Sequence, residues 1–315
     1  MGKVRISVII SVRNAQKSIA KCLDSIFGVD YDNFEVIVVD DGSNDGTAQI
    51  LKEFLPKIKV VTNLVSHGPS AARNAAGLIA SGELLAFTDA DCLVHRQWLN
   101  ELERCFVEYP LSVSAGGCQL LPIDAGSFQK KVQRLFEKSA GMTDYIKSGS
   151  GMRLVHHNPS CNSIYKRDAF LREGGFLEGL WPGEDVELDL RLRRKGYLIV
   201  FNPKAIVYHY RQESMKAFQR MMFRYGNAQG FLVRRYGFFR AIHFFPIVIF
   251  TGIIILLFVA INRPMALLLC GIAGMVGAGI FFSFDLRLIF LAASGCVAWS
   301  AGFSRGFVKK DAQVN

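Results

Sequence analysis

The first part of the chain alternates short apolar runs with segments in which apolar residues recur at helical spacing. The apolar runs predict buried strands because they are continuous, short and rich in β-branched residues. Strands are predicted at 4–10, 34–39, 59–62 and 84–88, and helices at 19–26, 47–55 and 70–80. This alternation predicts an α/β fold, a Rossmann-like and mostly parallel sheet with right-handed crossovers and helices on both faces.

Acidic side chains follow the ends of two predicted strands. Asp40 and Asp41 follow the second strand, and Asp89 and Asp91 follow the fourth. Because residues i and i+2 of an extended chain point the same way, we expect Asp89 and Asp91 to face one point in space. Ligands of parallel sheets bind beyond the carboxyl ends of the strands, and carboxylate oxygens suit Mg²⁺ or Mn²⁺, often together with a phosphate. A lone Asp-x-Asp also fits a strand that runs into an acidic turn.

The helix predicted at 70–80 carries a cation near its start. Gly68 and Pro69 introduce the helix, since proline suits the first helical position, and Arg73 follows about one turn later. The helix leads directly into the strand that ends at Asp89, so Arg73 would reach a phosphate held there by a cation. A single arginine on such a helix also fits a solvated face. The dinucleotide fingerprint GxGxxG is absent after the first strand.

Two further acids begin the helix predicted at 184–195. Glu184 and Asp185 lie in its first turn, where the helix dipole favours carboxylates for structural reasons alone. Trp181, just ahead, would offer an apolar ring face to an acceptor molecule, or is simply a half-buried aromatic side chain. A later short strand carries His209 near its end. This histidine fits either a structural role or a nitrogen ligand, which would favour Mn²⁺ over Mg²⁺.

Hydrophobic residues make up half of the 315-residue chain, but they are unevenly distributed. The segment 244–303 carries as charges only Arg263, Asp285 and Arg287. A transmembrane region with two or three spans is therefore predicted over 244–315. Its apolar segments are 244–261, 265–284 and 286–303. Three spans would place the basic tail on the far side, against the positive-inside tendency, whereas two would leave the last segment re-entrant or interfacial.

The part of the chain at 211–243 is basic and amphipathic. Apolar residues recur on one side at helical spacing, and basic residues follow one another every four positions on another. The apolar positions are Met215, Phe218, Met222 and Tyr225, and the basic ones are Lys216, Arg220 and Arg224. This pattern predicts interfacial helices that lie on an anionic membrane surface. A basic stripe also suits nucleic acid, but the adjacent hydrophobic tail favours the bilayer as the partner.

The N-terminus and the cysteines predict an N-terminal domain that stays in the cytosol. No basic segment, short apolar core and small-residue cleavage site precede Ile6, so we expect no secretory signal. The seven cysteines are odd in number and lack a CxxC pair, which suits reduced thiols better than a disulfide framework or a zinc site. We therefore expect a multi-pass protein of the cell membrane with its N-terminal domain, residues 1–210, in the cytoplasm.

Several motifs follow one another in a fixed order. They are Ser7-Val8-Ile9-Ile10, Val38-Val39-Asp40-Asp41-Gly42-Ser43, Ala71-Ala72-Arg73-Asn74, Thr88-Asp89-Ala90-Asp91, and Gly183-Glu184-Asp185 with Arg191 behind it. The set resembles the nucleotide-sugar glycosyltransferases of the large inverting family 2, which have the GT-A fold. The resemblance covers about residues 4–210, so a GT-A catalytic domain is expected at 1–210.

The resemblance implies roles for the acids at the strand ends. Asp40 and Asp41 would bind the base and ribose of the sugar donor. Asp89 would hold the ribose and the metal, and Asp91 and His209 would complete a site for Mn²⁺ or Mg²⁺.

The resemblance also implies a reaction. In similar enzymes the second residue of the Glu-Asp pair removes the proton from the acceptor hydroxyl, which assigns Asp185 as the general base and Glu184 as a contact to the acceptor. Because a helix N-terminus lowers a carboxylate's pKa, we expect Asp185 to be a weak base whose proton transfer is late. One sugar would pass from a UDP- or GDP-linked donor to a hydroxyl of a lipid-linked or cell-envelope glycan acceptor, with inversion at the anomeric carbon.

Two alternatives stay open. A polyprenyl-phosphate monosaccharide synthase has an ionised phosphate as acceptor and needs no base. The Gln-His-Pro-Pro run that usually follows its Asp-x-Asp is replaced here by Cys92-Leu93-Val94-His95. A non-catalytic membrane scaffold would leave clustered carboxylates without a cation to offset their repulsion. Processive polysaccharide synthases are disfavoured, because the chain lacks their Gln-x-x-Arg-Trp motif.

Overall fold

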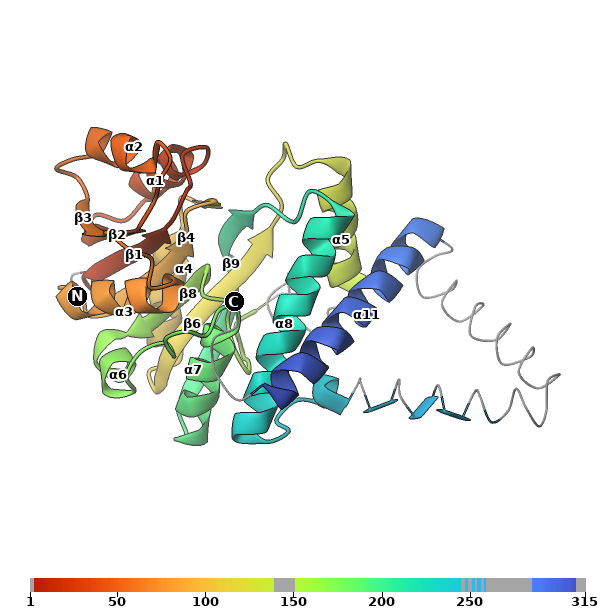
Figure 1. Ribbon diagram of the computed structural model, residues 1–315. Coiled ribbons are helices and arrows are strands. Elements are labelled where there is room, and N and C mark those ends of the chain that lie inside the picture. The colour runs from red at the N-terminus through yellow and green to blue at the C-terminus, as the bar shows by residue number, and fades with distance from the viewer. Residues whose placement is uncertain are drawn as a thin grey trace. The chain divides into compact units, whose positions relative to one another are not determined.

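A computed structural model of the protein describes residues 3–138, 151–244 and 285–309, and some positions between 247 and 258 (Figure 1). The chain forms two compact units. The first comprises residues 1–125 and 143–211, and the second comprises residues 126–142 and 212–314. All of the site residues predicted from the sequence belong to the first unit.

A mixed sheet forms the centre of the first unit. Its strands are β1 (Ile6–Val12), β2 (Phe34–Asp41), β3 (Lys59–Asn63), β4 (Leu84–Asp89), β5 (Cys92–Val94), β6 (Ser112–Leu120), β7 (Arg153–Leu154), β8 (Asn162–Lys166) and β9 (Leu198–His209). They follow the order β3-β2-β1-β4-β8-β6-β9-β5, and β7 pairs with β9. The four strands predicted in the first part of the chain are all present, and they pair in parallel as expected.

The second half of the sheet differs from the prediction. β8 runs antiparallel to both β4 and β6, and β5 and β7 run antiparallel to β9. Only β6 and β9 pair in parallel there. The prediction of a mostly parallel sheet is therefore wrong for this half. Parallel neighbours need a long crossover connection, and the irregular sequence ahead of β8 carries no periodic pattern from which a strand direction can be derived.

Helices cover both faces of the sheet, as predicted. One face carries α1 (Ile19–Phe27), α2 (Thr47–Glu53) and α4 (Trp98–Glu108), and the other carries α3 (Pro69–Ile79), α6 (Arg167–Arg172) and α7 (Glu184–Arg194). Successive residues of a strand point to opposite faces. Val8 therefore lies in one hydrophobic core and Ile9 in the other, both fully buried. The two cores fix the register of β1 against its neighbours, and that register aligns the carboxyl ends of β1, β2 and β4.

The second unit is helical. It contains α5 (Ser127–Lys138), α8 (Met215–Tyr236), the short 3-10 helix η1 (Ala241–Phe244) and α11 (Leu286–Val308). Glycines allow α8 and α11 to approach closely. A Cβ atom at Gly226 or Gly230 would overlap the backbone of α11, and one at Gly302 or Gly306 would overlap the backbone of α8. The apolar side of α8 was predicted to face a membrane, but Phe218 packs against α5 and α11 and is 1% exposed, so the prediction is wrong for this residue.

Within the part of the chain that the structure describes, α11 is the one helix long and apolar enough to cross a membrane. It contains the third apolar segment predicted from the sequence, 286–303. The segment 265–284 and most of 244–261 lie outside the described residues, so the predicted number of spans stays a prediction.

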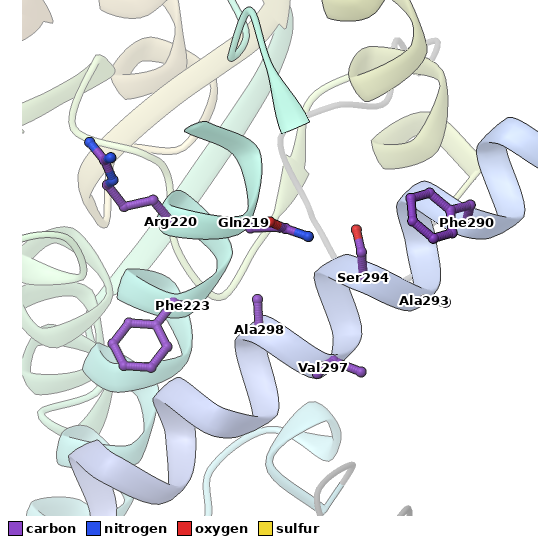
Figure 2. A pocket seen from close by; sticks show the side chains of 8 residues that line it. All are labelled: Gln219, Arg220, Phe223, Phe290, Ala293, Ser294, Val297 and Ala298. Atoms are coloured by element: carbon purple, nitrogen blue, oxygen red, sulfur yellow. The ribbon is translucent and has the colours of Figure 1, made fainter. Parts of the chain in front are cut away.

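A shallow apolar groove of about 640 Å³ runs between α8 and α11 (Figure 2). Its lining residues are Gln219, Arg220, Phe223, Phe290, Ala293, Ser294, Val297 and Ala298. The groove lies entirely within the second unit, so it includes none of the acids predicted to form the site.

Candidate active site

Two acids flank the end of β1 at the carboxyl edge of the sheet. Asp40 pairs with Val12 across β2 and β1, and Asp89 pairs with Ser11 across β4 and β1. Neighbouring strands lie about 4.8 Å apart, so the register places these carboxylates on either side of one strand end. Asp40 is 2% exposed, and its Oδ1 accepts a hydrogen bond from the Ser43 backbone N–H (3.0 Å).

Asp41 binds groups of the protein itself. Its carboxylate accepts hydrogen bonds from Asn63 Nδ2 (2.8 Å), Ser66 Oγ (2.6 Å), His67 N (2.9 Å) and Gly68 N (2.8 Å). Burial raises the pKa of Asp41, but these hydrogen bonds outweigh it, and the net pKa lies below the usual value. The carboxylate therefore fixes the loop that leads into α3.

Arg73 on α3 connects the sheet edge to α7. Its Nη2 donates to Asp89 Oδ1 (2.6 Å) and its Nη1 donates to Glu184 Oε1 (2.7 Å). The side chain is 2% exposed, and its guanidinium lies 5.9 Å from the ring centre of Phe176. Burial lowers the pKa of Arg73, but the two carboxylates raise it further, so the group stays charged. One buried cation thus holds two acids that are far apart in the sequence.

Glu184 begins α7 and is 2% exposed. Besides the Arg73 bond, its Oε1 accepts a hydrogen bond from Ser160 Oγ (3.0 Å). Burial and the adjacent Asp185 carboxylate raise the pKa of Glu184 to about 7, although Arg73 acts in the opposite direction. Gly183 precedes the helix with φ 105°, a conformation that favours glycine, and lets the chain turn sharply into α7.

Asp185 is held by two backbone N–H groups. Ser160 N donates to its Oδ2 (3.0 Å) and Val186 N to its Oδ1 (2.7 Å). Burial raises the pKa of Asp185 by more than these hydrogen bonds and Arg73 lower it. The predicted lowering by the helix N-terminus is therefore wrong, because the loss of hydration outweighs the local donors. A carboxylate with a raised pKa is a stronger base.

The predicted metal ligands meet where β5 pairs with β9. Cys92 lies opposite His209 in this ladder. Ligand atoms of Asp89, Asp91, Cys92 and His209 lie within 4.8 Å of one another, and His209 Nε2 is 3.7 Å from Asp91 Oδ1. The Nδ1 atom of His209 is buried without a hydrogen-bond partner. Two carboxylates and an imidazole with an unpartnered nitrogen fit Mn²⁺ or Mg²⁺.

Cys161 belongs to a second group that shares Cys92 and His209 with the first, and no sequence motif predicted it. The sulfur atoms of Cys92 and Cys161 and a nitrogen of His209 lie within 4.8 Å of one another. Gln119 Nε2 donates a hydrogen bond to Cys161 Sγ (2.9 Å). A hydrogen bond from Cys92 lowers the pKa of Cys161 to about 7, and burial opposes this effect. The two cysteines are far apart in the sequence, so no spacing motif joins them.

Ser160 is a second site residue that the sequence did not reveal. Its N–H and hydroxyl bind Asp185 and Glu184 respectively, yet in the sequence it lies in an ordinary polar turn after a proline.

Trp181, the predicted acceptor contact, precedes α7 and is 38% exposed. Of the residues predicted from the sequence, the structure joins Asp89 to Glu184 in the first turn of α7 through Arg73.

Comparison with known proteins identifies a family and several relatives. The family model described as glycosyl transferase family 2 matches residues 7–173. The chain is 27% identical over 275 residues to a dolichyl N-acetyl-alpha-D-glucosaminyl phosphate 3-beta-D-2,3-diacetamido-2,3-dideoxy-beta-D-glucuronosyltransferase of Methanococcus voltae, which covers 81% of this chain and 84% of the relative. It is 37% identical over 105 residues to the UDP-Glc:alpha-D-GlcNAc-diphosphoundecaprenol beta-1,3-glucosyltransferase WfgD of Escherichia coli, which covers 33% of this chain and 40% of the relative.

A solved structure has a similar fold. It is the mannosyltransferase PcManGT from Pyrobaculum calidifontis in complex with GDP-Man and Mn²⁺, with a TM-score of 0.64 and 21% sequence identity. The match covers 93% of this chain and 86% of that chain. At this identity the likeness concerns the fold alone, and it confirms the GT-A-like α/β architecture predicted from the sequence.

Proposed function

Because the chain belongs to glycosyl transferase family 2, we propose that it transfers one sugar from a UDP- or GDP-linked donor to a hydroxyl of a lipid-linked glycan acceptor, with inversion at the anomeric carbon. The observation that carries this proposal is the hydrogen-bonded set of Asp89, Arg73 and Glu184. It joins the strand end proposed to hold the donor to the helix proposed to hold the acceptor. Such a link suits a reaction in which two substrates must meet in one orientation.

The nucleotide of the donor is assigned to the strand end beside Asp40. Asp40 would contact the base or the ribose. Asp41 would affect donor binding indirectly, by holding the loop at 63–68 in place. Its carboxylate already accepts four hydrogen bonds from that loop.

Arg73 is proposed to position other groups instead of contacting a phosphate. Its side chain is 2% exposed, and both terminal nitrogens already bind carboxylates. It would hold Asp89 toward the donor and Glu184 toward the acceptor. A buried cation between two acids also prevents their mutual repulsion from disrupting the site.

Asp89, Asp91 and His209 would hold Mn²⁺ or Mg²⁺. The bound cation would offset the negative charge that builds on the departing diphosphate. The Asp91 side chain is 55% exposed, so it is open to a cation that arrives with the donor. The imidazole ligand favours Mn²⁺ over Mg²⁺.

Asp185 would take the proton of the acceptor hydroxyl. As the hydroxyl oxygen bonds to the anomeric carbon, the bond from that carbon to the diphosphate oxygen breaks on the opposite side, which inverts the configuration. Ser160 N–H orients the carboxylate, and burial raises its pKa. A base built in this way favours a hydroxyl acceptor over the ionised phosphate of a polyprenyl-phosphate monosaccharide synthase, which needs no base.

The relatives and the second unit support a lipid-linked acceptor. The names of the two relatives describe a dolichyl-phosphate-linked and a diphosphoundecaprenol-linked sugar. Helix α11 is long and apolar enough to cross a membrane. We therefore propose that the enzyme is anchored in the cell membrane with its catalytic unit in the cytoplasm, where anchoring raises the local concentration of lipid-linked acceptors.

The test uses the full chain in lipid nanodiscs. A panel of UDP- and GDP-sugars is supplied with Mn²⁺ and with dolichyl- or undecaprenyl-linked sugar acceptors, and nucleoside diphosphate release and lipid product mass are measured. We expect one donor to give a product that is heavier by one sugar, with the anomeric configuration opposite to that of the donor in NMR spectra. If no donor releases nucleoside diphosphate with either Mn²⁺ or Mg²⁺, the proposal is wrong and a non-catalytic scaffold is favoured.

A further inference from the structure

Two buried cysteines beside the carboxylate site form a second set of ligand atoms with His209. Cys92 is 0% exposed and Cys161 is 4% exposed. Their sulfur atoms and a nitrogen of His209 lie within 4.8 Å of one another. Cys92 lies on β5, His209 lies opposite it on β9, and Cys161 directly precedes β8. Two paired strands and the residue before a third strand of the same sheet therefore supply the three groups, which leaves little freedom for them to separate.

The two sulfur atoms and the imidazole nitrogen favour a softer cation than the Mn²⁺ or Mg²⁺ that the carboxylates favour. Two sulfurs and an imidazole nitrogen are preferred ligands of Zn²⁺, which binds sulfur at about 2.3 Å and nitrogen at about 2.0 Å in a tetrahedron. Neighbouring ligand atoms in such a tetrahedron lie roughly 3.3–3.8 Å apart. Atoms already within 4.8 Å need only small side-chain rotations to close on an ion. Asp91 Oδ1 lies 3.7 Å from His209 Nε2 but is grouped with Asp89 in the carboxylate set, which does not include Cys161.

Hydrogen bonds from the buried Gln119, which is itself held by Arg211, orient the thiol of Cys161. Gln119 is 2% exposed, donates its Nε2 hydrogen to Cys161 Sγ (2.9 Å), and accepts a hydrogen bond at Oε1 from Arg211 Nη1 (3.1 Å). An amide that donates to the sulfur favours the thiolate, which is the form that binds metal. Fixed partners of this kind orient the ligands in metal sites.

We propose that Cys92, Cys161 and His209 form a site for Zn²⁺ or another thiophilic divalent cation, and that this cation competes with the Mn²⁺ or Mg²⁺ of the carboxylate site. The competition rests on the proposed function, because that function assigns His209 to the carboxylate site. A neutral imidazole has one nitrogen lone pair that can bind a metal ion. His209 can therefore complete either the thiol site or the carboxylate site, but not both at once. Zinc binding would release the two thiol protons to solvent and inhibit sugar transfer.

Cobalt(II) is the direct probe of the thiol ligands, because cobalt thiolates give an intense near-ultraviolet band that cobalt carboxylates lack. The reduced full chain in nanodiscs is titrated with Co²⁺ and then with Zn²⁺ as competitor. We expect the thiolate band to saturate at a single ion per chain and to disappear when Zn²⁺ is added. Absence of a saturable thiolate band in the unaltered protein would overturn the proposal without the use of any variant.

Three variants locate the site. Cys161→Ser keeps an acceptor for Gln119 and should weaken Zn²⁺ binding by more than roughly tenfold, and Gln119→Ala should weaken it by about tenfold. Cys105→Ser alters an equally buried thiol on α4 and should bind Zn²⁺ as the unaltered protein does. Thermal unfolding confirms that each variant is folded, and Cys92→Ala replaces Cys161→Ser if the latter does not fold. Unchanged affinity in the folded variant of either ligand cysteine contradicts the proposal.

A separate assay distinguishes the zinc site from the proposed function. Mn²⁺-dependent transfer is measured at increasing Zn²⁺. We expect inhibition that added Mn²⁺ relieves and that Cys161→Ser weakens. If the cobalt thiolate band forms but no donor is ever used, the thiol site stands and the proposed function fails. If transfer occurs and Zn²⁺ neither binds nor inhibits, the proposed function stands and the thiol site fails.

Discussion

The two carboxylate pairs of the site, Asp89 with Asp91 and Glu184 with Asp185, are built in opposite ways. Glu184 is 2% exposed and Asp185 is held by two backbone N–H groups. The Asp91 side chain is 55% exposed, and its Oδ1 lies 3.7 Å from His209 Nε2. The α7 side is therefore organised in advance by the protein, whereas the proposed metal site at the end of β4 would need a cation to complete it.

This difference predicts different responses to mutation. Changes on the α7 side should lower the turnover number or the stability and leave the metal requirement intact. Changes at Asp91 or His209 should raise the metal requirement and leave the fold intact. Arg73 lies between the pairs and contacts both, so its loss should affect stability and turnover together.

The largest effect on rate is expected for Asp185→Asn. The substitution keeps the size of the side chain but removes the base, and loss of a general base commonly lowers kcat by about 10²–10⁴-fold. Donor affinity should change little, because Asp185 is assigned to the acceptor. Steady-state kinetics and donor binding measure the two effects separately. The exposed Asp168→Asn on α6 is the matched control, and equal rates for both variants would disprove the assignment of the base.

The largest effect on stability is expected for Arg73→Met. Removal of one partner of a buried ion pair leaves an uncompensated charge, here on Glu184, and costs about 3–5 kcal/mol of unfolding free energy. Adding Glu184→Gln should restore much of this stability without restoring transfer. Urea unfolding gives the free energies. Arg96→Met removes an exposed pair with Asp30 and should change stability little, so an equally small change for Arg73→Met would contradict a structural role.

A smaller effect is expected for His209→Ala. Loss of one nitrogen ligand should weaken the affinity for Mn²⁺ by about 10–100-fold, while saturating Mn²⁺ should restore part of the activity. Transfer measured over a Mn²⁺ titration gives the apparent affinity. An unchanged metal dependence would remove His209 from the site.

The smallest effect is a shift in pH dependence. The base acts in its ionised form, so kcat/KM should fall as the pH decreases through the raised pKa of Asp185. Arg73 lowers that pKa, so Arg73→Met should move the acid limb to higher pH, whereas Arg73→Lys should leave it nearly in place. The pH dependence of kcat/KM, recorded at saturating Mn²⁺, gives the position of this acid limb. A limb that moves to lower pH in Arg73→Met would contradict this electrostatic interpretation.

The position of the strand-end acids at the edge of the sheet could be predicted from the sequence because the pattern that places them is local. Asp40, Asp89 and Asp91 follow short apolar runs, and the carboxyl ends of neighbouring parallel strands must share one edge. The parallel half of the α/β sheet was predictable for the same reason, whereas the GT-A-like fold was expected from the resemblance to family 2.

The remaining features depend on contacts between distant parts of the chain. Ser160 and Cys161 enter the site because β8 runs antiparallel beside β4, and no local pattern specifies that direction. The pKa of Asp185 was predicted in the wrong direction because the helix N-terminus can be recognised in the sequence, whereas burial is produced only by tertiary packing.

The central claim, that Asp89 and Asp91 at the end of β4 and His209 on β9 bind one divalent cation together with the donor diphosphate, is tested most directly by anomalous X-ray diffraction. Crystals of the full chain are grown with Mn²⁺ and a nucleoside diphosphate, and data are collected at the manganese absorption edge. We predict a single strong peak in contact with Asp91, His209 and the diphosphate. A bound diphosphate with no manganese peak beside Asp91 would contradict the claim.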